Sequence, residues 1–448
     1  MPKKRPPISR RGSLKLRKTL SMPGLLKRVR DQFERIEDRR KKGVQYTLPD
    51  VLMSGLAMFT LKDESLLRFD GLRDVRRDNL RTLFGIEKAP CDTQMRQVLD
   101  GVDPCSLRPA FREIHREGRR QGVLESYRFF GKYLVSIDGT GQFSSSQVSC
   151  PECCQRHHRD GRVSYYHQLL GAVIVHPDQP TVLPYCPEAI TRKDGSSKND
   201  CEHNASRRLL SALAREFPRL EMIILQDALA CNGPHIQALQ AQGFSFIISA
   251  KPKPNSLLLK QLLAGLEAGD TREIETVNAK GFKCGYRYAN GLSLNSSHPH
   301  IQVNFIDYWE ERPDGSQWIY ACVTDLPLTA DNVADVVRAG RSRWKVENET
   351  FNTLKNQGYN LEHNYGHGKQ HLSTVFAYLM MLAFLLDQVQ EACCRYFQAA
   401  RDRHHSRKAL WDAMRSWFHT LILPDWETFF SALIWEPTKQ VPVWNDSG

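Results

Sequence analysis

The sequence predicts a mixed α/β fold in which a central sheet carries a β-rich insertion and lies between two helical regions. Short runs of β-forming residues alternate with helical stretches from Tyr127 to about residue 250, the pattern of an α/β sheet. Between residues 270 and 325, strand-like runs follow one another with turns but no helical pattern between them. Helical periodicity dominates residues 46–122 and again residues 329–432.

These patterns divide the chain into four regions. They are a basic arm (1–45), a helical region suited to DNA binding (46–126), a sheet-containing core (127–385) with a β insertion at about 255–328, and a helical C-terminal region (386–448).

The N-terminal segment concentrates the positive charge. The net charge is +12, and residues 1–42 alone hold sixteen Lys and Arg against four acids, while the remainder holds 46 residues of each sign. Such an arm is typical of polyanion binding, and nucleic acid is the commonest polyanion; a solvated disordered tail is the alternative. The residues expected to contact DNA are Lys3, Lys4, Arg5, Arg10 and Arg11.

Targeting signals and cysteines indicate the compartment. The N-terminal segment lacks the apolar stretch of a secretory signal, although an Arg-rich transit peptide is an alternative. Twelve cysteines without such a signal indicate a reducing compartment. The longest apolar run, from Leu372, spans about fifteen residues and predicts a buried core helix rather than a membrane span. We therefore expect a cytoplasmic protein without a membrane partner.

The helical region before the sheet carries arginines between its predicted helices. They are Arg73, Arg76, Arg77 and Arg81. A helical module with basic loops suits DNA contact, but arginines on the wet faces of helices are common in any protein.

Two aspartates each close a run of β-forming residues. Asp138 ends "YLVSID" and Asp227 ends "MIILQD". Functional side chains in an α/β sheet gather at the carboxyl ends of strands, although an aspartate there is also a common turn former or helix cap. We expect both aspartates at the ends of neighbouring strands.

A third acid is predicted to face inward from a helix. Glu347 shares a helical face with three apolar residues, Trp344, Phe351 and Leu354. Glu349 lies about 200° around the helix and is expected to face outward. A carboxylate turned inward needs a partner. That partner is either Arg343, four residues earlier on the same face, or a metal ion.

Two strand-terminal aspartates and one helical glutamate have the composition of a divalent-metal site. Three carboxylates cannot converge without a cation, because their like charges would force protonation. Hard oxygen ligands with open positions suit Mg²⁺. A pair of such ions activates a hydroxyl and stabilises the leaving oxygen in phosphodiester chemistry.

Three segments, "SIDGT", "LQDAL" and "RWKVENETFNTLKNQG", resemble the catalytic segments of DDE transposases of bacterial insertion sequences, which have a ribonuclease H-like core. The resemblance covers roughly residues 46–385 and is most specific in the third segment, where Arg, three residues, then Glu is the family pattern. It implies that Asp138, Asp227 and Glu347 bind two Mg²⁺ ions, for which Mn²⁺ can substitute. It also implies that Arg343 contacts DNA phosphate near the cut, and the strand-rich insertion resembles that of one branch of the family.

The chain departs from that branch at two positions. The branch has a tyrosine three residues before the arginine, where this chain has Gly340. Its lysine follows the glutamate by seven residues, whereas Lys355 follows by eight. On a regular α-helix that spacing rotates Lys355 about 80° away from Glu347. Lys355, whose implied role is to contact DNA, would then lie off the face that carries Glu347.

Cysteines and histidines indicate a second site. "CPECCQRHH" contains the Cys-x-x-Cys pair Cys150 and Cys153, and "NDCEH" adds Cys201. Tetrahedral Zn²⁺ needs four ligands, commonly a short-spaced pair joined by ligands from elsewhere. The three cysteines are candidate ligands of a structural zinc ion, with nearby histidines at His157, His158 and His203. Buried free thiols are the alternative.

The resemblance implies a DNA transposase that binds the terminal inverted repeats of a mobile element, acts as a homodimer on DNA, cleaves strands and joins the freed 3′-hydroxyl to target DNA. A stand-alone nuclease with the same core would cut but not join. A non-catalytic DNA-binding protein derived from a transposase would do neither, and the intact acidic triad argues against it. Only the resemblance separates the nuclease from the transposase.

Overall fold

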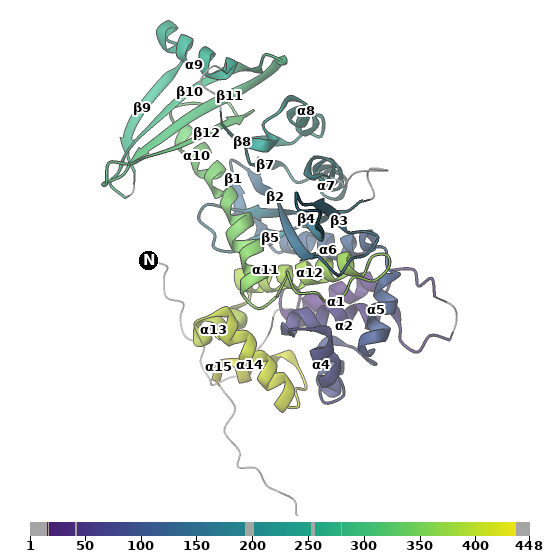
Figure 1. Ribbon diagram of the computed structural model, residues 1–448. Helices are drawn as coiled ribbons and strands as arrows, with labels where there is room; N and C mark the ends of the chain where they lie inside the picture. The colour runs from purple at the N-terminus through teal and green to yellow at the C-terminus, as the bar shows by residue number, and fades with distance from the viewer. Residues whose placement is uncertain are drawn as a thin grey trace, which may run out of the picture.

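The predicted fold class is confirmed by the computed structural model, in which a mixed twelve-stranded sheet is flanked by helices from both ends of the chain. Figure 1 shows the strands of the insertion at the top and the N- and C-terminal helices together at the bottom. The structure describes residues 16, 18–40, 43–192, 201–251, 256–278 and 280–435.

The sheet runs through most of the core region. Its strands are β1 (Arg128–Phe129), β2 (Lys132–Ser145), β3 (Cys154–His157), β4 (Val163–Val175), β5 (Leu183–Pro184), β6 (Glu188–Ile190), β7 (Met222–Gln226), β8 (Ser245–Ala250), β9 (Arg272–Val277), β10 (Lys283–Asn295), β11 (His298–Glu311) and β12 (Gln317–Thr324). The order is β3-β4-β2-β7-β8-β12-β11-β10-β9, with β1 paired to β2 and with β5 and β6 paired to β4.

The central strand is β2. It pairs antiparallel with β4 on one side and parallel with β7 on the other, and β8 continues the parallel part. This part of the sheet therefore combines an antiparallel pair with two parallel strands. The buried run of β2, Tyr133–Ile137, is almost entirely apolar because helices cover both faces of this part of the sheet.

The β insertion extends this sheet rather than forming a separate one. Helix α9 (Leu257–Ala268) comes first, and β9 to β12 then form an antiparallel meander. The last of these strands pairs antiparallel with β8. The strands predicted between residues 270 and 325 are therefore confirmed, and through β12 they share an edge with the core strands.

Helices fill the rest of the described chain. The α-helices are α1 (Met22–Phe33), α2 (Leu48–Leu61), α3 (Leu66–Leu72), α4 (Arg77–Phe84), α5 (Asp92–Asp100), α6 (Arg108–Arg120), α7 (Glu202–Glu216), α8 (Gly233–Ala241), α10 (Val333–Arg341), α11 (Asn352–Asn356), α12 (Leu372–Cys393), α13 (Arg395–His404), α14 (Arg407–Thr420) and α15 (Trp426–Trp435). Short 3₁₀-helices lie at η1 (Pro104–Leu107), η2 (Val123–Tyr127), η4 (Ala228–Ala230) and η5 (Ser342–Trp344), and η6 (Val346–Phe351) is a π-helix.

The long apolar helix α12 is the core of the helical body. Among the described residues it is the one helix long and apolar enough to cross a membrane by length and composition, and its apolar window is completely buried inside the protein. It packs against α2, α5, α6 and α13. Its single buried acid, Asp387, accepts hydrogen bonds from Lys62 and from the hydroxyl of Tyr359.

The N- and C-terminal helical regions form one body rather than two. The amide of Asn79 in α4 donates to the carbonyls of Phe418 and Leu421. The indole of Trp426 in α15 donates to the carbonyl of Leu83 at 2.9 Å. The C-terminal region predicted from residue 386 therefore packs on the region predicted for DNA binding, and both rest on α12.

Part of the predicted basic arm is a buried helix. Helix α1 places its apolar residues against α6 and α2, with Leu25, Val29 and Phe33 fully buried. Arg28 pairs with Glu113 at 2.7 Å. The arm predicted over residues 1–45 was thus drawn too long, because the high Lys and Arg content hid an amphipathic spacing. Five predicted DNA contacts lie outside the described residues: Lys3, Lys4, Arg5, Arg10 and Arg11.

A buried histidine joins α6 to the sheet and gives a pH prediction. His115 donates from Nε2 to the carbonyl of Pro184 at 2.9 Å and stacks on Tyr185. Burial lowers its pKa to about 4, against about 6.5 in the unfolded chain. Because the unfolded state takes up the proton first, this contribution to stability is complete above pH 6.5 and is lost as the pH falls towards 4.

We therefore expect His115→Phe to weaken the acid sensitivity of folding. Between pH 7 and pH 4 the wild-type free energy of unfolding should fall by about 3 kcal/mol more than that of the variant. Urea denaturation of both proteins at the two pH values measures this difference. Equal losses for the two proteins would contradict a neutral, buried His115.

Candidate active site

Asp138 lies where β2 extends beyond its parallel neighbour. The last paired residues of the two strands are Ser136 in β2 and Leu225 in β7, so Asp138 comes two residues after the parallel ladder ends. On its other side, Asp138 is paired with Gly171 of β4. A side chain at this point stands at the carboxyl end of the parallel strands, the usual location of functional groups in α/β sheets.

Asp227 follows the neighbouring strand. It comes directly after β7 and, like Asp138, lies two residues beyond the last pair of the parallel ladder. Its carboxylate accepts a hydrogen bond from the backbone amide of Leu229 at 3.0 Å and thereby caps η4. Asp227 therefore acts as a helix cap, which was the alternative considered from the sequence. It also lies at the strand end where a functional carboxylate was expected.

Arg343 bridges two of the predicted acids. Its Nη1 lies 2.8 Å from Oδ2 of Asp138, and its Nη2 lies 2.7 Å from Oε1 of Glu347. The guanidinium and the Asp138 side chain are largely buried, whereas the Glu347 side chain is 50% exposed. The arginine therefore contacts both carboxylates at once.

The three carboxylates do not form a closed cluster. Within the described residues, the oxygens of Asp138, Asp227 and Glu347 do not all lie within 4.8 Å of one another. Like charges repel, and the Arg343 guanidinium lies between the first and the third. The structure thus brings Asp138, Arg343 and Glu347 together and places Asp227 on the adjacent strand.

The pKa values of Asp138 and Glu347 shift in opposite directions. Burial and the neighbouring Glu347 carboxylate raise the pKa of Asp138 to about 6, while Arg343 acts in the opposite direction. Burial also opposes ionisation of Glu347, but hydrogen bonds with Arg343 and Asp138 outweigh it and lower the pKa of Glu347. The more exposed acid therefore keeps its charge, and the more buried acid is the one that takes up a proton as the pH falls.

The predicted orientation of Glu347 is wrong. Trp344, expected to be buried beside it, is 43% exposed. The residues buried between 345 and 354 are Lys345, Val346, Thr350, Phe351, Thr353 and Leu354. The segment is not a regular α-helix, because η5 is a 3₁₀-helix and η6 is a π-helix. A prediction at 100° per residue therefore assigns the wrong face. The Glu347 side chain is half exposed to solvent and pairs with Arg343.

The π-helix accounts for the unusual spacing of Lys355. A π turn bonds residue i to i+5 and holds one residue more than an α turn, so one π turn and one α turn hold about eight residues instead of about seven. By this count Lys355, eight residues after Glu347, falls on the same face of the helix. Its Nζ pairs with Glu362 at 2.8 Å, and it lines an open cavity of about 830 Å³ between α11 and α14.

Close packing explains two glycines around this helix. A Cβ on Gly171 would lie 2.9 Å from the ring of Phe351, so the glycine lets η6 approach β4 opposite Asp138. A Cβ on Gly340 would lie 2.1 Å from the hydroxyl of Tyr320 in β12. The space that a tyrosine at position 340 would need is thus occupied by a tyrosine from the insertion.

Two anchors that the sequence analysis missed position the helix. The hydroxyl of Ser136 donates to the carbonyl of Arg343 at 3.0 Å and ties η5 to β2. Lys345, which is 6% exposed, donates to the carbonyls of His176 and other residues of the loop that follows β4. The signal for Ser136 was a polar residue within the otherwise apolar run Tyr133–Ile137, because a buried polar group implies a specific partner.

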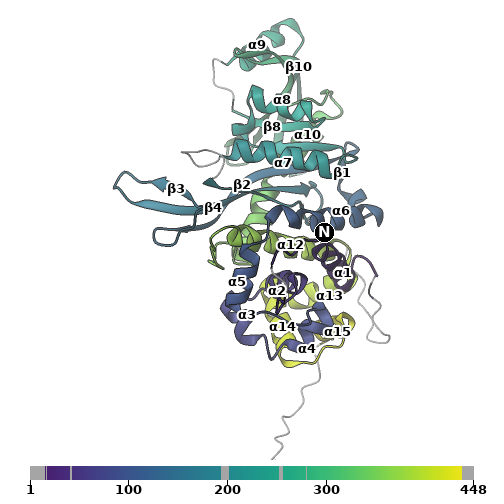
Figure 2. The ribbon, with the colours of Figure 1, turned by 90° about the vertical axis from the view of Figure 1, so that its right-hand side faces the viewer.

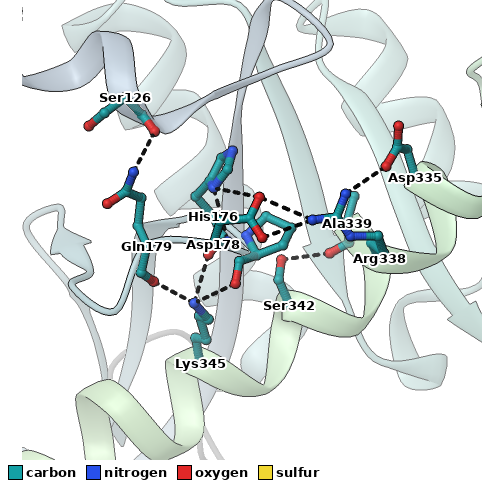
Figure 3. Close-up of polar contacts among 10 residues, drawn as sticks. Ser126, His176, Asp178, Gln179, Asp335, Arg338, Ala339, Ser342 and Lys345 are labelled. Carbon is teal, nitrogen blue, oxygen red and sulfur yellow. Dashed lines mark hydrogen bonds and ion pairs between the residues drawn. The ribbon is translucent and has the colours of Figure 1, made fainter. Parts of the chain in front are cut away.

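Figure 3 shows how the loop after β4 holds this helix. Lys345 Nζ lies 2.7 Å from the His176 carbonyl and also contacts that of Gln179. Seven residues earlier, Arg338 pairs with Asp178 at 2.8 Å on the protein surface. The buried lysine and the exposed arginine bind the same loop, so they form a matched pair for mutation.

We expect Lys345→Met to destabilise the protein by about 1–3 kcal/mol, because several carbonyls lose their donor. Arg338→Met, which removes an exposed ion pair, should cost about 1 kcal/mol or less. Chemical denaturation of both variants tests this difference. A Lys345→Met protein as stable as Arg338→Met would show that the lysine does not anchor the helix.

Known proteins give little guidance. No protein-family model matches the chain, and no curated protein matches it. Among solved structures, a cryo-EM structure of a piggyBac transposase synaptic complex with hairpin DNA aligns over 96% of this chain and 86% of that chain, with 11% sequence identity and a TM-score of 0.37. That similarity is too weak to establish a common fold, so the function is inferred from the site.

Proposed function

We propose that this chain is a metal-dependent DNA transposase of the DDE type. The observation that carries the proposal is the meeting of Asp138 and Glu347 on one guanidinium. Arg343 reaches Asp138 across 205 residues of sequence, at the carboxyl end of a parallel strand pair whose second strand leads into Asp227. Stability alone gives these two acids and the arginine little reason to converge. The Arg343–Glu347 pair has a half-exposed acid and contributes little, and the largely buried Arg343–Asp138 pair carries a cost of desolvation.

The acids fit a hard divalent cation. Asp138, Asp227 and Glu347 would hold Mg²⁺, which prefers carboxylate oxygens. Burial and the neighbouring Glu347 carboxylate raise the pKa of Asp138, and a cation at the site would favour its ionised form. When bound, the metal would supply activation of the attacking oxygen and stabilisation of the leaving oxygen.

The other residues would act on the DNA. Arg343 presents a planar guanidinium beside the acids, which suits bidentate contact with a phosphate near the cut. Lys355 lies two turns beyond Glu347 on the same face and would contact the backbone further along. The partners we propose are the terminal inverted repeats of a bacterial insertion sequence and target DNA. We also propose that two copies act together on DNA in the cytoplasm.

Incubation of the full chain with its own flanking DNA and Mg²⁺ tests this function. A transposase produces excised element and joined product. Cleavage without joining would instead identify a nuclease, and binding without cleavage a DNA-binding protein. Asp138→Asn and a reaction with EDTA are the controls, and both should abolish cleavage.

A further inference from the structure

Four side chains that could ligate a metal meet at one end of the sheet, away from the three acids. The ligand atoms of Cys150, Cys153, His167 and His367 all lie within 4.8 Å of one another. The Cys150 and Cys153 sulfurs are 3.6 Å apart, and each lies 3.3 Å from Nε2 of His167. The Cys153 sulfur is also 3.6 Å from Nδ1 of His367.

The fold builds this cluster from three separate segments. Cys150 and Cys153 form a turn before β3, in which the Cys150 amide donates to the Cys153 sulfur at 3.3 Å. His167 comes from β4, which forms with β3 the hairpin that projects from the side of the molecule (Figure 2). His367 comes from the segment between α11 and α12, and its ring packs on Phe143 of β2.

The separations match a tetrahedral zinc site. With Zn–S of about 2.3 Å and Zn–N of about 2.0 Å, neighbouring ligand atoms of a tetrahedron lie roughly 3.3–3.8 Å apart. The four measured separations span 3.3–3.6 Å. A sulfur–sulfur distance of 3.6 Å also excludes a disulfide, whose bond is about 2.05 Å.

Burial gives a second, independent indication. Cys153, His167 and His367 are 1%, 3% and 9% exposed. Cys150 is partly buried. Two imidazoles and two thiols in mutual contact have few hydrogen bonds to offer one another, since a thiol is a weak donor and acceptor. Coordination to one metal ion would satisfy all four at once.

We propose that Cys150, Cys153, His167 and His367 bind one structural Zn²⁺ ion. The set corrects the ligands expected from sequence, of which Cys150 and Cys153 remain. Cys201 is exposed at the start of α7 and is not a member of the cluster. Four protein ligands close the coordination sphere, which is typical of structural rather than catalytic zinc.

The ion would tie the sheet to the segment that follows the Glu347 helix. His167 stands four residues before Gly171, on which Phe351 packs. His367 lies in the connection that runs from α11 to α12, where Asp100 of α5 accepts four consecutive backbone amides, from Lys369, Gln370, His371 and Leu372. Zinc would thus join β4 to a connection that the helical body also holds, and this role does not depend on the proposed DNA chemistry.

Metal analysis of the full-length protein, purified with Zn²⁺ and dialysed, tests the proposal. We expect one zinc ion per chain in the wild type and near none in Cys153→Ser and His367→Asn. Cys201→Ser is the matched cysteine control and should keep its zinc. Asp138→Asn should keep it as well, which separates this site from the acidic one.

Cobalt replacement of the wild-type protein needs no variant. Reconstitution with Co²⁺ should give the intense visible bands of tetrahedral cobalt with thiolate charge transfer, and Zn²⁺ should displace them. Limited proteolysis between residues 361 and 371 should accelerate several-fold on zinc removal. Folded wild-type protein that takes up neither metal, or loss of zinc from Cys201→Ser equal to that from Cys153→Ser, would overturn the proposal.

Discussion

Glu347→Gln should lower DNA strand cleavage by roughly two to four orders of magnitude and leave DNA binding in place. The substitution keeps the shape of the side chain and removes the charge that would hold the metal. Because the Glu347 side chain is half exposed and pairs with Arg343, loss of its charge should cost about 1 kcal/mol of stability or less. Gel-based cleavage and DNA-binding assays, with a thermal melt of each protein, measure the three effects.

Glu349→Gln is the matched control. Glu349 lies in the same π-helix, and its charge acts on the buried amine of Lys345. Its substitution should leave cleavage within a few-fold of the wild type. If Glu347→Gln cleaves almost as well as Glu349→Gln, the acid has no part in the chemistry.

Removal of residues 2–15 should weaken DNA binding and flatten its dependence on salt. This segment holds six Lys and Arg, including Lys3, Lys4, Arg5, Arg10 and Arg11. If all six contact phosphates, the slope of log affinity against log salt should fall in magnitude by about 5, because each contact releases about 0.9 counterion. Binding titrations between about 50 and 200 mM salt measure the change.

Sequence preference should survive this deletion, since phosphate contacts position the protein without specifying a sequence. The deletion stops at residue 15 because α1, with Leu25 and Val29 fully buried, belongs to the core. Removal of residues 2–42 would also remove α1. A loss of DNA binding could then reflect unfolding of part of the helical body and not the loss of phosphate contacts. An unchanged salt slope would show that the arm does not bind DNA.

The location of the two aspartates at strand ends could be predicted, because buried strands appear in the sequence as runs of β-forming residues. Asp138 and Asp227 each end a run of β-forming residues, and their equal distance from the parallel ladder follows from the strand pairing alone. The Arg343–Glu347 pair could be expected from its four-residue spacing. The β insertion was equally clear, because its strands alternate with turns and not with helices.

The local shape of the Glu347 helix could not be predicted. A change from 3₁₀ to π geometry within ten residues depends on tertiary contacts, such as the Ser136 hydroxyl on the Arg343 carbonyl and the packing of Phe351 on Gly171. A prediction that assumes a regular α-helix therefore places Trp344 and Glu347 on the buried face. It also places Lys355 on a different face from Glu347. Helical periodicity predicts that a segment is helical. It does not predict which residues face the core where the helix is distorted.

The complete Cys/His cluster also could not be predicted from the sequence. Cys150 and Cys153 form a visible pair, but His167 and His367 lie 14 and 214 residues from Cys153. One of them is an ordinary residue of a strand and the other lies in a connection between helices. Nothing local distinguishes them from other histidines, whereas Cys201, which looked suitable, faces away at the surface.

A metal-exchange measurement on Asp227→Cys tests most directly whether the three acids hold the metal that cuts DNA. Asp227 is the stringent choice, because it is not within metal-bridging distance of both other acids in the described structure. Strand cleavage by the full-length variant would be measured with Mg²⁺ and with Mn²⁺. A thiolate is a poor ligand for hard Mg²⁺ and a better one for Mn²⁺. We predict near-complete loss of cleavage with Mg²⁺ and substantial recovery with Mn²⁺. Cleavage with Mg²⁺ close to that of the wild type would contradict the assignment.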